Sequence, residues 1–263
     1  MYTLRHIYRK LPDRFYTMSK NFKFGLRGMS TRFRSNGEII EVTEGDLFWT
    51  THRNRAHLYS NGLLERGAAI GKSYLLENID FEDGDLVVDC GANMGDLQLW
   101  FLLKDIKIKY LGIEPNPSDF QCLSRNLLPG SSCLNVALWN ENGNLKFWVD
   151  TESASSSLIE PPNHTKVISI ESVRIDGLEN LDRIKLLKVE GEGAEPEILL
   201  GAAKLLEKIH YISVDVGPER GLEQLSTRAD VSKIMSEFDY KVVLENPYHR
   251  ETILFENSSH RKL

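Results

Sequence analysis

Two acidic residues and two glycines near the middle of the chain have types and spacing that suit ligand binding. The stretch VVDCGANMGD, residues 87–96, places Asp89 at the end of an apolar run and Gly91 and Gly95 in the turn that follows. Glu114 closes the next apolar run. A strand that leads through a glycine turn into a helix N-terminus is a recurring ligand site in proteins.

The side chains around this turn discriminate between ligands. A dinucleotide site needs a second glycine where the pyrophosphate approaches the backbone, and the chain has Asn93 there. A P-loop needs Gly-Lys-Ser/Thr at the end of its glycine turn, and this turn, GANMGD, does not contain it. Glu114 can accept both hydroxyls of a ribose, Asp89 places negative charge near an ammonium or sulfonium, and the helix N-terminus favours a carboxylate. S-adenosylmethionine carries all three groups, so we expect it as the cofactor.

The elements that must position these residues alternate along the chain. We expect strands over 86–89, 109–114, 132–138, 166–174, 184–190 and 211–216. We expect helices over 95–104, 117–128 and 227–238, with another after Gly193. This alternation predicts an α/β fold, a doubly wound and mostly parallel sheet with helices on both faces. The last two apolar runs have too short a link for a crossover, so they should be antiparallel.

A second feature interrupts this alternation. NENGN, residues 140–144, contains an Asn-Gly pair, and the following LKFWV reads as the returning strand of an inserted β-hairpin. The polar segment 151–165 is long for a loop in a compact domain, and such loops tend to be functional.

Ligands of such sheets bind outside the carboxyl ends of the strands, which selects the candidate residues. The cofactor-binding candidates are Asp89, Gly91, Asn93, Gly95, Asp96, Glu114, Pro115, Asn116, Asn135 and Ala137. The catalytic candidates are Glu190, Glu192 and His249, because a carboxylate or histidine on this face could remove a proton from the acceptor. The spacing of the carboxylates demands no metal, so none is predicted.

Four motifs together resemble the FkbM-type methyltransferases. They are VVDCGANMGD, GIEPNPSDFQCLSRNL, NVAL followed by a hairpin, and LLKVEGEGAEPEILLGA. The family pattern around the fourth motif is Lys-hydrophobic-Asp-hydrophobic-Glu-Gly. Here Glu190 replaces the aspartate and Gly191 replaces the second hydrophobic residue.

The resemblance implies a class I methyltransferase fold, Rossmann-like, with a seven-stranded sheet whose last strand is antiparallel. It also implies O-methyl transfer from S-adenosylmethionine to a hydroxyl, commonly of a sugar in a glycan or glycolipid, or of a secondary metabolite. Two alternatives stay open at this point. One is a non-catalytic S-adenosylmethionine-binding subunit of a glycan-assembly complex, and the other is a nucleotide-dependent oxidoreductase.

Charge is distributed unevenly along the 263 residues. Residues 1–34 carry nine Lys/Arg and one acid, a net +8, so the rest of the chain carries −14 within the total of −6. We therefore expect two parts, a basic N-terminal extension with a helical cap over 1–80 and the methyltransferase domain over 81–263. The arm suggests an anionic partner, such as a membrane surface, whereas the acidic body argues against nucleic acid.

Compartment signals are consistent with a cytoplasmic enzyme. The longest apolar run, 99–103, is far below the roughly 20 residues that a membrane span needs. The three cysteines have no CxxC spacing, and the N-terminus has no apolar core of a secretory signal. We expect a cytoplasmic protein whose residues 1–34 could contact the inner face of the membrane. No sequence signal sets the oligomeric state or names the acceptor.

Overall fold

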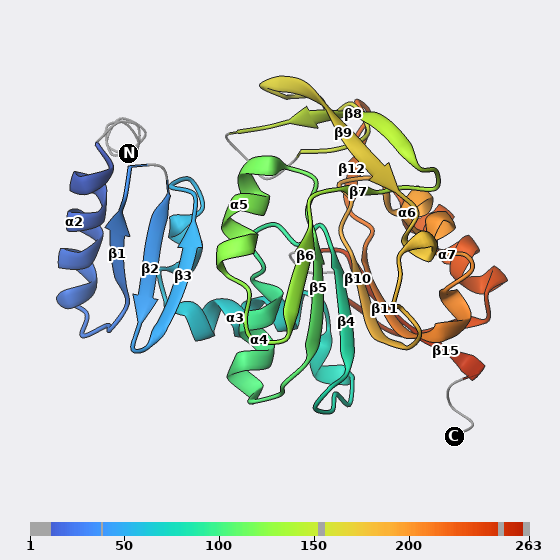
Figure 1. The fold of residues 1–263 in the computed structure, drawn as a ribbon, viewed down its shortest axis with the longest axis horizontal. Helices are drawn as coiled ribbons and strands as arrows, with labels where there is room; N and C mark the ends of the chain where they lie inside the picture. Colours follow the sequence, from blue (N-terminus) through green and yellow to red (C-terminus); the bar gives the residue numbers. More distant parts are fainter. Residues whose placement is uncertain (1–11, 38, 152–155, 247–249, 260–263) are drawn as a thin grey trace.

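The computed structural model describes residues 12–37, 39–151, 156–246 and 250–259. Figure 1 shows a main domain built on one large sheet, with a smaller unit from the N-terminal part of the chain at its side. A third, small sheet lies across one end of the main domain. No helix among the described residues is long and apolar enough to cross a bilayer.

The central sheet has seven strands in the order β14-β15-β11-β10-β4-β5-β6. Their bounds are β4 (Leu86–Cys90), β5 (Lys109–Ile113), β6 (Ser131–Leu134), β10 (Ile184–Val189), β11 (Ile209–Asp215), β14 (Tyr240–Asn246) and β15 (Thr252–Asn257). The five strands from β11 to β6 pair in parallel, and β15 is antiparallel to both β11 and β14. The predicted mostly parallel sheet with an antiparallel last strand is therefore confirmed.

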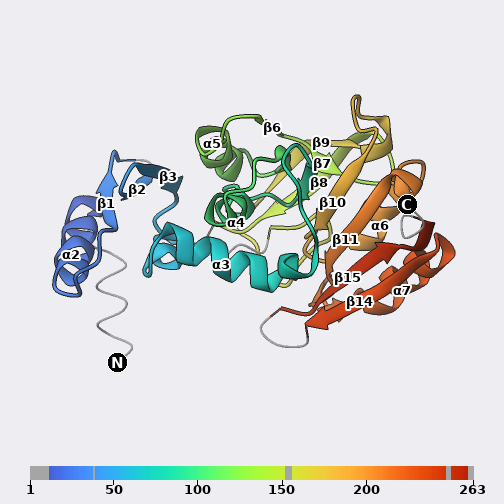
Figure 2. The same ribbon diagram turned by 90° about the horizontal axis from the view of Figure 1, so that it is seen from below.

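Helices cover both faces of this sheet (Figure 2). The helices on one face are α3 (Leu63–Ser73), α4 (Leu97–Lys104) and α5 (Pro117–Arg125), and those on the other are α6 (Glu195–Gly201) and α7 (Arg228–Glu237). Successive strand residues point to opposite faces, so Val87 packs in the core under α4 whereas Val88 packs in the core under α6 and α7. The central strands are therefore apolar on both sides, as parallel strands usually are.

The N-terminal extension differs from its sequence-based prediction. It contains α2 (Asp13–Gly25) but also a three-stranded antiparallel sheet of β1 (Arg32–Ser35), β2 (Ile40–Glu44) and β3 (Leu47–Thr51). The extension thus combines helices with a sheet that the sequence analysis did not predict, and alternate side chains of these strands form a core. Ile40, Val42 and Trp49 are buried together with Phe24 of α2.

Helix α3 joins the extension to the main domain through two glycines. A Cβ on Gly67 would lie 2.5 Å from the carbonyl oxygen of Leu99, and one on Gly71 would lie 1.8 Å from the indole of Trp100. Only glycine allows α3 to approach α4 this closely. The extension is therefore packed against the sheet domain rather than tethered beside it.

The inserted hairpin also forms with a different partner. β8 (Gly143–Val149) pairs antiparallel with β9 (Lys166–Val173), and β7 (Ala137–Leu138) pairs parallel with β9. The predicted strand 132–138 is split, because β6 stays in the central sheet and the chain then leaves it. Phe147 of β8 and Ile170 of β9 share a small core with Ala137, which fixes this pairing.

Short elements complete the described chain. They are η1 (Ala56–Tyr59), η2 (Leu76–Asn78), η3 (Ile175–Gly177), η4 (Leu206–Lys208), β12 (Pro218–Arg220) and β13 (Leu225–Ser226).

Candidate active site

A cavity lies at the carboxyl ends of β4, β5 and β10, bounded also by the extension and the β7-β9-β8 sheet. Nine of the thirteen sequence-predicted site residues line it. They are Asp89, Gly91, Asn93, Asp96, Glu114, Pro115, Ala137, Glu190 and Glu192. These residues lie at or just after the carboxyl ends of β4, β5, β6 and β10, which is the edge of the sheet where ligands of such folds bind.

Of the other four predicted residues, three do not line the cavity and one lies outside the described residues. Asn116 caps α5, because its side chain accepts a hydrogen bond from the backbone N–H of Ser118. Asn135 Nδ2 donates to the carbonyl oxygens of Glu114 (2.8 Å) and Pro115 (3.1 Å). Gly95 has a φ of +81° in the turn before α4. His249 lies outside the described residues.

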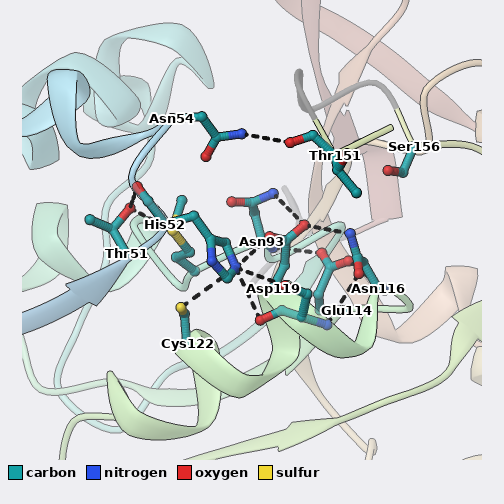
Figure 3. Close-up of polar contacts among 12 residues, drawn as sticks. Thr51, His52, Asn54, Asn93, Glu114, Asn116, Asp119, Cys122, Thr151 and Ser156 are labelled. Carbon is teal, nitrogen blue, oxygen red and sulfur yellow. Dashed lines mark hydrogen bonds and ion pairs between the residues drawn. The ribbon is translucent and has the colours of Figure 1, made fainter. Parts of the chain in front are cut away.

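Glu114 is a buried carboxylate held by the backbone (Figure 3). Its Oε1 accepts from the backbone N–H of Asn116 and its Oε2 from that of Asn93, both at 2.8 Å. Burial, followed by the nearby charge of Asp119, raises the pKa of Glu114 to about 8. Each oxygen makes one backbone bond and can accept another, so the carboxylate is fixed in place yet still able to bind hydroxyls.

The glycine turn packs closely against Glu190, which belongs to the motif LLKVEGEGAEPEILLGA. Gly91 has a φ of +70°, and a Cβ there would lie 2.1 Å from the carbonyl oxygen of Glu190. Asn93 also adopts a left-handed conformation, with a φ of +50°, which presents its N–H to Glu114. Glycine at position 91 is therefore required by close packing as well as by φ.

Lys188 is a buried residue in the cavity wall and the centre of a polar network. Its Nζ lies 3.0 Å from Asp89 Oδ1 and donates to the carbonyl oxygens of Cys90 (3.1 Å) and Gly91 (2.9 Å). Asp89 Oδ2 accepts from the hydroxyl of Tyr110 at 2.7 Å. Both oxygens of Asp89 thus have partners within the protein, and the ion pair joins β4 to β10 below the turn.

Glu190 belongs to the same network on the other side of Lys188. Its Oε2 lies 3.0 Å from Lys188 Nζ and accepts from the hydroxyl of Tyr74 at 2.5 Å, and its Oε1 pairs with Arg250. Arg250 Nη1 also lies 2.9 Å from Asp215 Oδ2. Three donors therefore hold the Glu190 carboxylate, which makes it an anchor of the cavity wall.

Glu192 sits in a loop organised by a different acid. Glu195 is buried at the start of α6, and its Oε1 accepts from the backbone N–H groups of Gly191 (2.8 Å) and Gly193 (3.1 Å). Its Oε2 accepts from Thr227 Oγ1 at 3.0 Å. This clamp holds Glu192 in a left-handed conformation, with a φ of +50°, facing the cavity.

The surroundings of Glu192 oppose its ionisation. Burial raises its pKa well above the ordinary value, and the carboxylates of Glu219 and Asp215 raise it further. Burial also raises the pKa of Glu219 to about 8 and that of Asp215 to about 6. Arg55, which lines the cavity from the extension, partly opposes this effect on Glu192. Within the described chain, the Glu192 carboxylate makes no hydrogen bond or ion pair.

Asp96 has protein partners that the sequence did not reveal. Its Oδ1 accepts from Trp49 Nε1 (3.0 Å) and the Tyr59 hydroxyl (2.7 Å), and its Oδ2 accepts from Arg66 Nε (2.7 Å). All three donors come from residues 49–66, whereas Asp96 precedes α4 in the main domain. Asp96 therefore fastens the extension to the edge of the cavity.

Sequence reasoning missed the residues that reach the cavity from distant parts of the chain. Arg55, Tyr74 and Arg250 line it, and none of them lies in a recognisable motif. Lys188 lies within the fourth motif, and its position before two acids was the one available signal. Among the described residues, no group of three or more His, Cys, Asp and Glu side chains is arranged to hold a metal ion.

Comparison with known proteins decides the family of this chain. The model of the methyltransferase FkbM domain matches residues 89–242, which is more than half of the sequence. This chain belongs to the FkbM methyltransferase family. The matched region begins at Asp89 and includes Glu114, Glu190 and Glu192, so it contains the central residues of the cavity described above.

Three curated relatives to which this chain is similar are named methyltransferases. Methyltransferase sdnD of Sordaria araneosa is 30% identical over 154 residues, which cover 44% of this chain and 59% of that protein. Methyltransferase 1 of Beauveria bassiana is 23% identical over 80% of this chain and 92% of that protein. Hexuronic acid methyltransferase AglP of Haloferax volcanii is 26% identical over 59% of this chain and 63% of that protein. The alignments thus span less than two thirds of the first and third relatives.

S-adenosylmethionine is the cofactor of this FkbM methyltransferase, and the cavity fits that molecule. Glu114 offers a carboxylate whose two oxygens can each accept a further hydrogen bond. Ile113, Pro115 and Leu138 supply apolar surface beside it. A carboxylate next to an apolar wall suits a ribose that bears an adenine.

Proposed function

We propose that this FkbM methyltransferase transfers a methyl group to a hydroxyl, and that the acceptor is a sugar of a glycan, a glycolipid or a secondary metabolite. The observation that carries the proposal is the Glu192 carboxylate, which lines the cavity with no hydrogen-bond or ion-pair partner among the described residues while burial raises its pKa. A carboxylate with a raised pKa is, once ionised, a stronger base than an ordinary one. Glu192 is thus suited to accept the proton of an attacking hydroxyl.

The roles of the other cavity residues follow from their contacts. Glu114 accepts hydrogen bonds from the ribose hydroxyls, and Pro115 and Ala137 contact the adenine. Gly91 and Asn93 approach the remainder of the cofactor from the turn. When bound, S-adenosylmethionine supplies an activated methyl group, so the protein mainly has to align the acceptor oxygen with it.

Glu190 acts in this proposal as a positioning residue. Lys188, Tyr74 and Arg250 fix its carboxylate, and it fixes in turn the side of the cavity next to the turn at Gly91. The base is thereby assigned to Glu192 rather than to Glu190.

Arg55 supports an acidic acceptor within the sugar class. It lines the cavity near Glu192, and none of the described carboxylates lies within ion-pair distance of its guanidinium. A free guanidinium in a cavity suits a carboxylate or phosphate group. The name of AglP, a hexuronic acid methyltransferase, is in line with an acceptor that carries a carboxylate.

Turnover with defined acceptors tests the proposal. Purified protein is incubated with S-adenosylmethionine and a panel of neutral and uronic sugars, and formation of S-adenosylhomocysteine and of methylated product is measured. An alkali-stable product is an ether and supports O-methylation of a hydroxyl, whereas an alkali-labile product is an ester and contradicts it. Cofactor binding without turnover on any acceptor would favour the non-catalytic alternative, and the family match already favours methyl transfer over the oxidoreductase alternative.

A further inference from the structure

Helix α2 has an apolar face that the described part of the chain leaves exposed. Phe15, Met18, Phe22 and Leu26 are 46%, 64%, 71% and 74% exposed. At 3.6 residues per turn, these four side chains fall within an arc of about 80° on one side of the helix. We call this set the α2 stripe. A helix of this length in a soluble domain would normally present polar residues there.

The α2 stripe is not the face that folds the extension. The opposite side of α2 carries Tyr16, Lys20 and Phe24, which are buried. Phe24 packs on Phe33 of β1 with ring centroids 5.3 Å apart, and Lys20 Nζ donates to the carbonyl oxygen of Ala56 at 2.9 Å. The helix thus has two apolar faces, of which one packs inside the extension and the other is exposed among the described residues.

Basic side chains border the α2 stripe. Arg14 and Lys23 flank it on either side of the helix, and both are exposed. Further exposed cations follow in the next turn and strand, namely Arg27, Arg32 and Arg34. Between residues 12 and 37, the acids described are limited to Asp13, which pairs with Arg53 at 2.5 Å. The surface around the stripe is therefore strongly positive.

The position of α2 makes this face accessible. In both ribbon views α2 is the outermost element, and β1, β2 and β3 lie between it and the main domain (Figures 1 and 2). The cavity lies at the carboxyl ends of the central strands, on the other side of the extension sheet. A flat surface can thus contact α2 without covering the cavity.

We propose that α2 lies in the interface of a membrane that contains anionic lipids. The α2 stripe would enter the boundary between headgroups and acyl chains while Arg14 and Lys23 contact lipid phosphates, as in amphipathic interfacial helices. A second copy of the chain fits less well, because pairing this face with itself brings two positive surfaces together. Four side chains also bury much less than the roughly 800 Å² per partner of a standard interface. The proposal does not depend on the acceptor of methyl transfer.

Sedimentation with vesicles tests this proposal on the full chain, because removing α2 would uncover the core that Tyr16 and Phe24 fill. Wild-type protein is expected to pellet with vesicles of phosphatidylcholine and phosphatidylglycerol at low salt, and much less with phosphatidylcholine alone. Added salt should weaken the binding, because it screens the exposed charges.

Paired variants separate the two components of the surface. Met18→Ser with Phe22→Ser should reduce partitioning onto anionic vesicles by about tenfold or more, because the double variant loses the apolar surface that these two side chains bury in the membrane interface. Arg14→Gln with Lys23→Gln should reduce it several-fold and flatten its salt dependence. Leu222→Ser with Leu225→Ser is the matched control, because these residues are 64% and 54% exposed but belong to the main domain.

The outcomes are decisive in either direction. Unchanged melting temperature and cofactor affinity in the Met18/Phe22 variant, together with lost vesicle binding, support the proposal. A wild-type protein that ignores anionic vesicles at low salt, or a Met18/Phe22 variant that binds them as wild type does, overturns it. If the variant instead changes only the oligomeric state in analytical ultracentrifugation, the α2 stripe is a contact between copies and the membrane proposal is wrong.

Discussion

His52 of the extension lies against Asp119 of helix α5, with Nε2 3.2 Å from Oδ1 (Figure 3). Asp119 also accepts a hydrogen bond from Asn116 Nδ2 at 3.0 Å, and Asn116 bonds Glu114 through its backbone. The extension therefore contacts the shell of residues that holds the proposed ribose-binding carboxylate. Asn54 adds a link to the segment after β8, because its Nδ2 donates to the carbonyl oxygen of Thr151 at 3.1 Å.

The pairing of His52 should make stability depend on pH. Hydrogen bonds to Asp119 and Cys122 raise the pKa of His52 to about 10, above the value of about 6.5 expected in the unfolded chain. The stabilisation is therefore complete below pH 6.5 and is lost as the pH rises through 10. We expect His52→Gln to lower the free energy of unfolding by about 1.5–3 kcal/mol at pH 6 and by less at pH 10. Urea denaturation at both pH values measures this, with the exposed His164→Gln as control.

If His52→Gln lowers the free energy of unfolding equally at pH 6 and pH 10, the His52 side chain stabilises the fold through packing rather than through its charge.

Ionisation of Glu114 should control binding of the nucleoside part of the cofactor. Burial raises its pKa to about 8, and only the ionised carboxylate can accept from both ribose hydroxyls. With this pKa, the Glu114 carboxyl group is ionised in about a tenth of the molecules at pH 7. The affinity for adenosine should therefore rise by up to about tenfold between pH 7 and pH 9. Calorimetric titration with adenosine, which lacks the methionine end, measures this dependence.

The substitution Glu114→Ala should weaken cofactor binding by about 2–4 kcal/mol and remove the pH dependence. Tight adenosine binding by this variant would contradict the assignment of Glu114 to the ribose.

Glu190 and Glu192 should respond differently to the same substitution. Glu192→Gln should leave cofactor affinity and melting temperature near wild type while kcat falls by about 10²–10⁴. In the wild type, kcat should increase with pH as Glu192 loses its proton, because burial raises its pKa. Glu190→Gln removes the negative charge that pairs with Lys188 and Arg250, so we expect it to lower the free energy of unfolding by about 1.5–3 kcal/mol.

The comparison uses cofactor affinity, melting temperature and turnover per folded molecule for both variants. If turnover survives in Glu192→Gln but is lost in a stable Glu190→Gln protein, Glu190 is the base and Glu192 is not.

Asp96 offers a test of how the extension is attached. Asp96→Asn weakens the contact to Arg66 and removes the charge that holds Trp49 and Tyr59. We expect a loss of stability of about 1.5–3 kcal/mol, with cofactor affinity changed by less than about twofold. Thermal unfolding and cofactor titration on the same sample separate the two effects. A large loss of affinity at unchanged stability would instead indicate direct contact between Asp96 and the cofactor.

The sequence by itself determined the order of elements in the central domain and the edge of the sheet where the cavity lies. Asp89, Glu114 and Glu190 each end or follow a run of apolar residues, and parallel strands place their carboxyl ends at one edge. The order of the elements and the positions of these acids follow from patterns among residues close together in the sequence, so the sequence alone was sufficient to predict them. The same patterns predicted the antiparallel final strand, because the link before β15 is too short for a crossover.

Only the tertiary structure decided which carboxylates of the site have partners among the described residues. Glu190 and Glu192 are two residues apart and look equivalent in the sequence. Tyr74 and Arg250, which are 176 positions apart in the sequence, both reach Glu190, whereas Glu192 faces Glu219 and the cavity. Packing between distant segments likewise decided that the extension contains strands and that β8 pairs with β9. Contacts between residues far apart in the chain depend on how the elements pack, and no local pattern records that packing.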